Sequence, residues 1–373
     1  MARRTDTIAA APETLARAEV QALTPYQSAR RIVAAAGGRG DVWLNANESS
    51  EAAPYALTQN LLNRYPDAQP GEVIARYARY AEVEPEQILV TRGGDEGIDL
   101  LVRTFCVPGR DAVLQFPPTY GMYSVCAETS NVRVVNLTTD PADDWAPDVD
   151  ALDEALERDP GIQVVFACSP NNPTGGLIAP ELLERLIEAT RGRAILVVDE
   201  AYIEFAPEAS AKSRLASAPH LVLIRTLSKA FALAGIRCGF LIGSPAVIGM
   251  LKKVIAPYPV PTPVADIAEQ ALSLGGVAAM ERRVAGTCKR RAELAQKLSA
   301  LPGVLEVRPS SSNFLLVRFA EGARVFKALW DQGIIVRDQS RQPTLANAIR
   351  ITVGTAEENA ELIAALRGIL GEA

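Results

Sequence analysis

The stretch "RTLSKAFALAGIRCGFLIG", Arg225–Gly243, places one lysine, Lys229, among small and apolar residues. The chain has 38 basic residues, but only seven are lysines, and none precedes Lys212. A surface lysine at the start of a helix is the ordinary interpretation, yet no acid lies near it in sequence. An apolar site lowers the pKa of a lysine, and the neutral amine can form a Schiff base. The surrounding stretch therefore favours a reactive lysine.

Three residues beside this lysine suit a phosphate group. Thr226 and Ser228 offer hydroxyls, and Arg237, eight residues after Lys229, carries a guanidinium fork that matches phosphate geometry. The apolar runs on either side, "LVLIRTLS" and "CGFLIG", are typical of buried strands.

Composition sets broad limits on the function. A chain of 373 residues is long enough for two or three domains, and 48% hydrophobic content is ordinary for a globular protein. The net charge of −6 argues against general nucleic-acid binding. Five cysteines without a C-x-x-C pair indicate reduced thiols, and a single histidine excludes a multi-histidine metal site. No secretion signal or apolar run of about 20 residues is present, so we expect a cytoplasmic protein without a membrane or metal site.

Helical patterns alternate with short apolar runs over residues 46–265, which predicts an α/β domain with a mostly parallel, seven-stranded sheet between helices. Residues 266–373 predict a smaller α+β domain, beyond the proline-rich stretch "APYPVPTPVAD". We expect residues 1–45 to form an arm and a helix that packs with the smaller domain. Ligands of open α/β sheets lie at the carboxyl ends of the strands. Five unusual loops follow predicted strands there, and they define one candidate site.

Each loop alone has an ordinary explanation. "TRGGDEGID" is either a plain strand-to-helix turn, capped by Asp95, or an anion site at a helix start. "SPNNPTGG" is either a plain turn or a rigid loop that fixes Asn172 so that its amide can hydrogen-bond a ring oxygen. Asp199 ends a very apolar strand, so it is either a cap, a salt-bridge partner or an acid that keeps a ring nitrogen protonated. Tyr202 follows three residues later and can donate a phenol hydrogen bond.

The order and spacing of these loops are more specific than any one of them. A phosphate anchor, an imine-forming lysine, an acid for a ring nitrogen and an Asn/Tyr pair for a ring oxygen together describe pyridoxal 5′-phosphate (PLP). The acid would keep the pyridine ring charged, which makes it an electron sink. The spacing of "RGGDEG" does not fit the G-x-G-x-x-G pattern of a nicotinamide-binding enzyme.

This order of motifs resembles the fold-type I, class II aminotransferases, in which an N-P-T-G loop, a D-x-x-Y acid and an S-K lysine follow one another. The resemblance is strongest to the histidinol-phosphate aminotransferase family and covers nearly the whole chain from residue 23. The stretches that carry it are "LTPYQSARR", "DVWLNANE", "LNRYPDAQP", "RGGDEGIDLL", "PPTYGMYSV", "CSPNNPTG", "DEAYIEF", "RTLSKAFALAGIRCGF", "APYPVPTPVADIA", "GIIVRDQ" and "IRITVGT".

The resemblance implies a role for each matching residue. Lys229 would form the Schiff base and move the proton between Cα and C4′, and Asp199 would pair the pyridine nitrogen. Asn172 and Tyr202 would hold the 3′-oxygen, and Tyr120 would stack on the ring. The phosphate would be bound by Gly94, Asp95, Thr226, Ser228 and Arg237. Tyr65 would reach the cofactor phosphate of a second subunit, which implies a homodimer, although from the residues alone it is better explained as a core aromatic.

The resemblance also implies the substrates: histidinol phosphate and 2-oxoglutarate would exchange an amino group, giving imidazole acetol phosphate and glutamate, in a step of histidine biosynthesis. Substrate contacts would come from Tyr26, Asn47, Arg337 and Arg350. Each arginine alone is more typical of a surface charge. An aromatic or broad-specificity aminotransferase, or a PLP-dependent decarboxylase of an amino-acid phosphate, would share the same cofactor loops. A ligand-sensing regulator of this fold would need a DNA-binding segment, and the sequence has no basic segment of that kind.

Overall fold

Seven short apolar strands form the central sheet of the computed structural model, which describes residues 16–23, 40–58 and 62–371. The strands are β2 (Ile88–Thr91), β3 (Ala112–Gln115), β4 (Arg133–Asn136), β5 (Ile162–Cys168), β6 (Ile195–Asp199), β7 (Leu221–Thr226) and β8 (Gly239–Gly243). Their order is β2-β8-β7-β6-β5-β3-β4, and only β8 runs antiparallel to its neighbours. The predicted α/β class and the mostly parallel sheet of seven strands are confirmed.

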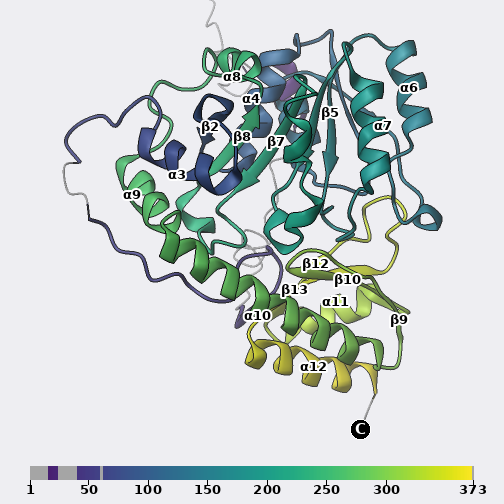
Figure 1. Ribbon diagram of the computed structural model, residues 1–373. Coiled ribbons are helices and arrows are strands. Elements are labelled where there is room, and N and C mark those ends of the chain that lie inside the picture. The colour runs from purple at the N-terminus through teal and green to yellow at the C-terminus, as the bar shows by residue number, and fades with distance from the viewer. Residues whose placement is uncertain (1–15, 24–39, 59–61, 372–373) are drawn as a thin grey trace, which may run out of the picture.

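Helices cover both faces of this sheet (Figure 1). One face carries α3 (Gly71–Ala81), α6 (Val149–Arg158), α7 (Pro180–Thr190) and α9 (Thr262–Ala271). The other face carries α4 (Gly94–Phe105), α5 (Met122–Thr129) and α8 (Pro245–Leu251). Successive strand residues point to opposite faces, so Leu196 and Val198 join the first core while Val197 joins the second. Burial on both faces explains why the inner strands are mostly apolar, whereas the edge strand β4 has exposed Arg133 and Asn136 at its ends.

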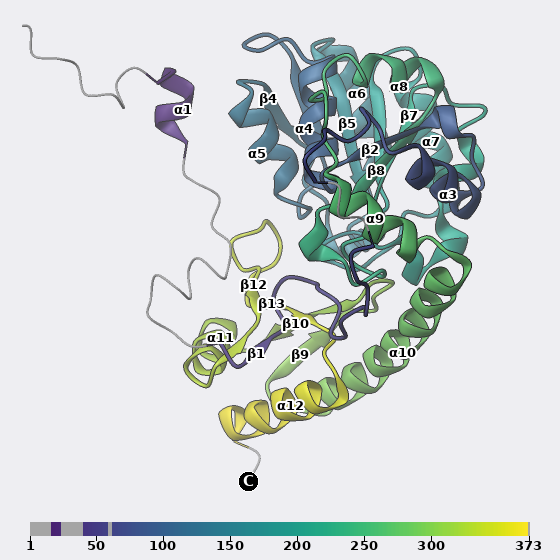
Figure 2. The same cartoon turned by 90° about the vertical axis from the view of Figure 1, so that its left-hand side faces the viewer.

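The C-terminal part is built on a four-stranded antiparallel sheet, in the order β12-β13-β10-β9. Its elements are α10 (Leu274–Ser299), β9 (Val304–Val307), β10 (Phe314–Phe319), α11 (Gly322–Asp331), β11 (Ile334–Ile335), β12 (Arg337–Asp338), β13 (Ala348–Thr352) and α12 (Ala356–Leu370). Figure 2 shows α10 as the long helix that joins the two parts. This agrees with the expected α+β arrangement. The partly exposed β9 was not predicted from the sequence, and the run "GIIVRD" divides into two short strands.

The N-terminal segment contacts both parts. β1 (Val42–Trp43) pairs in parallel with β11, which attaches residues 42–43 to the C-terminal part. Helix α1 (Ala18–Ala22) lies instead beside α5, where Arg17 Nη2 donates a hydrogen bond to the Thr129 carbonyl at 2.9 Å. The predicted packing of a helix from residues 1–45 against the smaller domain stays a prediction, because most of that segment lies outside the described residues.

Six short 3-10 helices complete the described chain: Pro85–Gln87, Pro141–Asp143, Ile203–Phe205, Pro207–Ala209, Ala211–Arg214 and Ala234–Ile236. Among the described helices, none has the length and apolar character needed to cross a membrane.

Candidate active site

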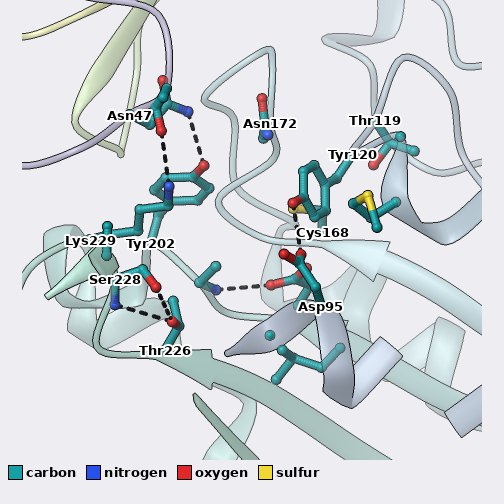
Figure 3. A pocket seen from close by; sticks show the side chains of 18 of the residues that line it. Asn47, Asp95, Thr119, Tyr120, Cys168, Asn172, Tyr202, Thr226, Ser228 and Lys229 are labelled. Atoms are coloured by element: carbon teal, nitrogen blue, oxygen red, sulfur yellow. Dashed lines mark hydrogen bonds between the residues drawn. The ribbon is translucent and has the colours of Figure 1, made fainter. Parts of the chain in front are cut away.

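A cavity of about 560 Å³ opens at the carboxyl ends of the parallel strands, where β12 and β13 of the C-terminal part face the central sheet. Its walls include thirteen of the residues that the sequence predicted for the site: Asn47, Gly94, Asp95, Tyr120, Asn172, Asp199, Tyr202, Thr226, Ser228, Lys229, Arg237, Arg337 and Arg350. The predicted convergence of the loops on one edge of the sheet is therefore confirmed. Figure 3 shows how Asn47, Asp95, Tyr120, Asn172, Tyr202, Thr226, Ser228 and Lys229 lie around this cavity.

Lys229 lies three residues beyond the end of β7, with its amine at the cavity. Its Nζ donates a hydrogen bond to the Ala46 carbonyl at 3.0 Å and lies 5.9 Å from the centre of the Tyr202 ring. Burial, with a smaller contribution from the positive charge of Arg350, lowers the pKa of Lys229 to about 8. A lysine with this pKa is neutral in part of the molecules near pH 7, as a nucleophilic amine requires.

Asp199 ends β6 beneath the same cavity and is 3% exposed. Its carboxylate accepts two hydrogen bonds, from the Tyr123 hydroxyl at 2.7 Å and from the Ala201 amide at 3.0 Å. Burial raises the pKa of Asp199 to about 6, against the opposite effect of these two bonds. The carboxylate is therefore mostly ionised at neutral pH in an apolar surrounding, a suitable partner for a protonated ring nitrogen.

A cluster of donors lies at the start of α4. Thr226 and Ser228 are joined hydroxyl to hydroxyl at 2.9 Å, and Arg237 Nη1 reaches the Ser228 hydroxyl at 3.3 Å. The helix is capped by Gly93, with φ of 82°, so the expected capping by Asp95 is wrong. Asp95 lies one residue into the helix from its start and forms an ion pair with Arg237 at 3.1 Å. Hydroxyls, a guanidinium and the amides at the start of a helix are groups that can bind an anion together.

Asn172 and Tyr202 are each held in one orientation by a neighbour. Arg350 Nη1 donates to Asn172 Oδ1 at 2.5 Å, so the amide nitrogen is the end that remains for a ligand. The Tyr202 oxygen accepts a hydrogen bond from Asn47 Nδ2 at 2.9 Å, which leaves the hydroxyl hydrogen to donate (Figure 3). Asn47 is buried, at 1% exposure, and this hydrogen bond fixes the position of the Tyr202 hydroxyl.

Two arginines face each other across the antiparallel strands β12 and β13. Arg337 is the direct register partner of Arg350. Like charges directly opposite each other on paired strands destabilise a sheet, and an anion bound between them would relieve the repulsion. Arg350 is buried at 8% exposure, and its Nη2 also donates to the Asn45 carbonyl at 2.5 Å.

The predicted aromatic residues have three different outcomes. Tyr120 borders the cavity, and its hydroxyl donates to Asp95 Oδ1 at 2.8 Å. Tyr65 is 82% exposed, does not line the cavity, and stacks on Tyr258 with ring centres 4.7 Å apart. Tyr26 lies outside the described residues. Tyr65 is therefore not a core aromatic in this chain.

The sequence analysis missed three contributors. Tyr123 of α5 binds Asp199, and its ring meets that of Tyr120, which precedes the helix, edge to face. Gln342 exchanges hydrogen bonds with the backbone of Thr119 across the mouth of the cavity. The sequence carries no signal for that pair, because the two residues meet only through the packing of the two parts.

Comparisons with known proteins agree with this geometry. Residues 40–366 match the family model described as aminotransferase class I and II. Histidinol-phosphate aminotransferase of Pectobacterium atrosepticum is 56% identical over 359 residues, which are 96% of this chain and 98% of that protein. The enzyme of the same name from Escherichia coli strain K12 is 56% identical over 95% of this chain and 97% of its own length.

Solved structures share the fold. The crystal structure of histidinol-phosphate aminotransferase from Sinorhizobium meliloti in complex with pyridoxal-5′-phosphate has a TM-score of 0.84 at 23% identity, over 96% of this chain and 98% of that one. The aspartate aminotransferase of Thermus thermophilus with maleate has a TM-score of 0.79 at 26% identity, over 94% and 98%. By its family model and by relatives that match along almost its full length, the chain belongs to the class I and II aminotransferases.

Proposed function

We propose that the chain is a PLP-dependent transaminase that interconverts L-histidinol phosphate and 2-oxoglutarate with imidazole acetol phosphate and L-glutamate. The observation that carries the proposal is the placement of Lys229 and Asp199 in the same cavity as the facing pair Arg337 and Arg350. The relatives named histidinol-phosphate aminotransferase, at 56% identity, support this choice of substrates and a role in histidine biosynthesis.

The residues of the cavity fit PLP group by group. When bound, PLP supplies an electron sink for the electrons released at the substrate Cα. Lys229 would bind the cofactor through Nζ, and the buried carboxylate of Asp199 would accept a hydrogen bond from the ring nitrogen. The Asn172 amide and the Tyr202 hydroxyl would hold the ring oxygen, and the Tyr120 ring would lie against the cofactor ring.

The cofactor phosphate would occupy the donor cluster at the start of α4. Its ligands would be the amides of Gly94 and Asp95, the hydroxyls of Thr226 and Ser228, and the guanidinium of Arg237. Free in the cavity during the reaction, the Lys229 amine would take the proton from the substrate Cα and return it later. A pKa near 8 lets the same atom accept and donate a proton close to neutral pH.

The facing arginines explain how one cavity would serve two different substrates. Histidinol phosphate carries a phosphate and no carboxylate, whereas 2-oxoglutarate carries two carboxylates. A guanidinium binds either group through paired hydrogen bonds. We propose that Arg337 and Arg350 hold the substrate anion in both half reactions, with Tyr26 adding a phenol contact and Asn47 acting by holding Tyr202.

A homodimer in the cytoplasm is also part of the proposal. Tyr65 and Tyr258 form an exposed stacked pair, which suits a contact with a second copy of the chain and the expected reach of Tyr65 to its cofactor phosphate. The five cysteines are free, as in proteins of a reducing compartment. We retain residues 46–265 as the cofactor-binding domain and 266–373 as the smaller domain, with residues 1–45 as the arm.

A substrate panel tests the function. The purified protein with PLP is offered histidinol phosphate, phenylalanine, tyrosine and threonine phosphate, and the amino-acceptor product and carbon dioxide are measured. We expect the highest kcat/KM for histidinol phosphate with 2-oxoglutarate and no carbon dioxide. Faster turnover of phenylalanine or tyrosine would identify an aromatic aminotransferase, and release of carbon dioxide from threonine phosphate would identify a decarboxylase. Absence of any turnover would indicate a ligand sensor.

A further inference from the structure

Among the described residues, Tyr123 is the one side chain that hydrogen-bonds to the Asp199 carboxylate, and neither the motifs nor the proposed chemistry assigned it a role. It lies in α5, is fully buried, and its hydroxyl donates to Asp199 Oδ2 at 2.7 Å. The ring is fixed in place, because it stacks on Phe166 of β5 with centres 4.6 Å apart and planes within 3°. It also meets the Tyr120 ring edge to face at 5.7 Å.

The groups around Asp199 make this hydrogen bond important for the ionisation of its carboxylate. The neighbouring charges that act on Asp199 are those of Asp95 and Glu200, and both oppose its ionisation. Cys168 and Tyr202 also interact with Asp199, and neither supplies a positive charge. The cations Lys229, Arg237 and Arg350 line the same cavity, but they are not among the charges that shift the pKa of Asp199. Against burial and two acids, the carboxylate has as donors, within the part of the chain that the structure describes, the Tyr123 hydroxyl and the Ala201 amide. The hydroxyl is thus the main side-chain contribution that favours the ionised form.

The hydroxyl can serve as a permanent donor. Burial and the charge of Asp199 raise the pKa of Tyr123 well above its ordinary value, so the phenol keeps its proton at any working pH. A donor to Oδ2 and an amide donor to Oδ1 also fix the plane of the carboxylate. That plane determines the direction in which the remaining lone pairs face the cavity.

We propose that Tyr123 is a positioning residue for the transamination: its hydroxyl holds the Asp199 carboxylate ionised and turned toward the nitrogen of the cofactor ring. The proposal rests on the proposed function for the cofactor and on the observed hydrogen bond for the action on Asp199. The competing explanation is that Tyr123 only fills the core, in which case its ring matters and its hydroxyl does not.

The test replaces the hydroxyl alone. In the full chain without cofactor, the carboxyl band of Asp199 is titrated by infrared spectroscopy in the parent protein and in Tyr123→Phe, and Asp199→Asn identifies the band. We expect Tyr123→Phe to raise the midpoint from about 6 to about 7 or above. Tyr77→Phe is the matched control, since Tyr77 is equally buried but belongs to the core on the other face of the sheet. It should leave the midpoint unchanged.

The holoenzyme supplies the second readout. Tyr123→Phe should lower kcat about tenfold, move the acid side of the pH profile to higher pH, and leave KM for glutamate nearly constant. An unchanged midpoint together with an unchanged pH profile would overturn the proposal. Failure of the parent protein to bind PLP would refute the proposed function, while the infrared titration would still decide the action on Asp199.

A measurement on the parent protein covers the case in which Tyr123→Phe does not fold. A phenol proton that is hydrogen-bonded to a buried carboxylate gives a low-field proton resonance, and that resonance should move to higher field in Asp199→Asn. A resonance that stays in place would overturn the proposal.

Discussion

Gly239, the first residue of β8, lies close to the backbone of the turn that starts α4, and this contact leads to a sharp prediction. A Cβ atom on Gly239 would lie 2.6 Å from the carbonyl carbon of Gly93 and 2.8 Å from the amide nitrogen of Gly94. Ordinary contacts begin near 3.4 Å, so Gly239→Ala requires a displacement of about 0.8 Å. The atoms that must move are backbone atoms of the turn that starts α4, so the rotation of a side chain cannot relieve the clash.

This displacement would act on stability and on cofactor binding. Overpacking of a tight contact costs about 1–3 kcal/mol, which lowers the Tm of a chain of this size by several degrees. The same turn presents the amides proposed for the cofactor phosphate. Loss of one hydrogen bond to a charged group costs about 1.5–3 kcal/mol, or about a tenfold to hundredfold increase in the Kd for PLP.

The assay is a fluorescence titration of cofactor-free protein with PLP, together with thermal unfolding with and without PLP. Gly249→Ala is the control, because it also adds one methyl group to a glycine but meets no atom within 4 Å in α8. It should bind PLP normally. A Gly239→Ala protein that binds PLP within about twofold of the parent would refute the placement of the phosphate at Gly93–Gly94, even if its Tm fell.

Three further predictions concern the charged residues. Lys229→Ala should abolish the visible absorbance of the bound cofactor and nearly all turnover, and an unchanged spectrum would exclude this lysine as the cofactor's partner. Arg350→Lys should raise KM for glutamate and 2-oxoglutarate about tenfold to a hundredfold in steady-state assays, because lysine cannot reproduce the fork that binds an anion and Asn172 together. Glu204 is buried, its carboxyl oxygens have no hydrogen-bond partner among the described residues, and burial raises its pKa to about 7 from an ordinary value of 4.5. The folded state therefore favours the protonated acid. The contribution of Glu204 to the free energy of unfolding is fully present below its unfolded pKa of 4.5 and is lost as the pH rises through its folded pKa of about 7. Glu204→Gln should raise Tm at pH 8 and change it little at pH 5, and an equal effect at both pH values would contradict the assignment.

The sequence predicted the cofactor loops well for a physical reason. Each loop follows a strand of the parallel sheet, and parallel strands bring their carboxyl ends to one edge whatever the details of packing. Residues such as Asn172, Asp199 and Lys229 were therefore placed in one cavity by chain order alone.

The contacts that hold those residues could not be predicted in the same way. The bonds of Asn47 to Tyr202 and of Gln342 to Thr119 join positions more than 150 residues apart, and they depend on how the C-terminal part meets the sheet. Tyr65 shows a different limit. The contact that we propose between this exposed side chain and a second copy of the chain depends on a surface that a single sequence does not place.

Arg350 would connect the proposed cofactor contacts with the proposed substrate contacts. Its guanidinium holds Asn172 from the large sheet and the Asn45 carbonyl from the N-terminal segment, while its own strand belongs to the C-terminal part. Phe314 of β10 packs beneath both Arg350, at 5.5 Å, and the Tyr202 ring, at 5.2 Å. An anion bound at Arg350 therefore acts on the group that orients Asn172. The substrate's charged end and the proposed hold on the cofactor oxygen are thus coupled through one side chain, so a substitution of Arg350 should alter the cofactor spectrum as well as KM.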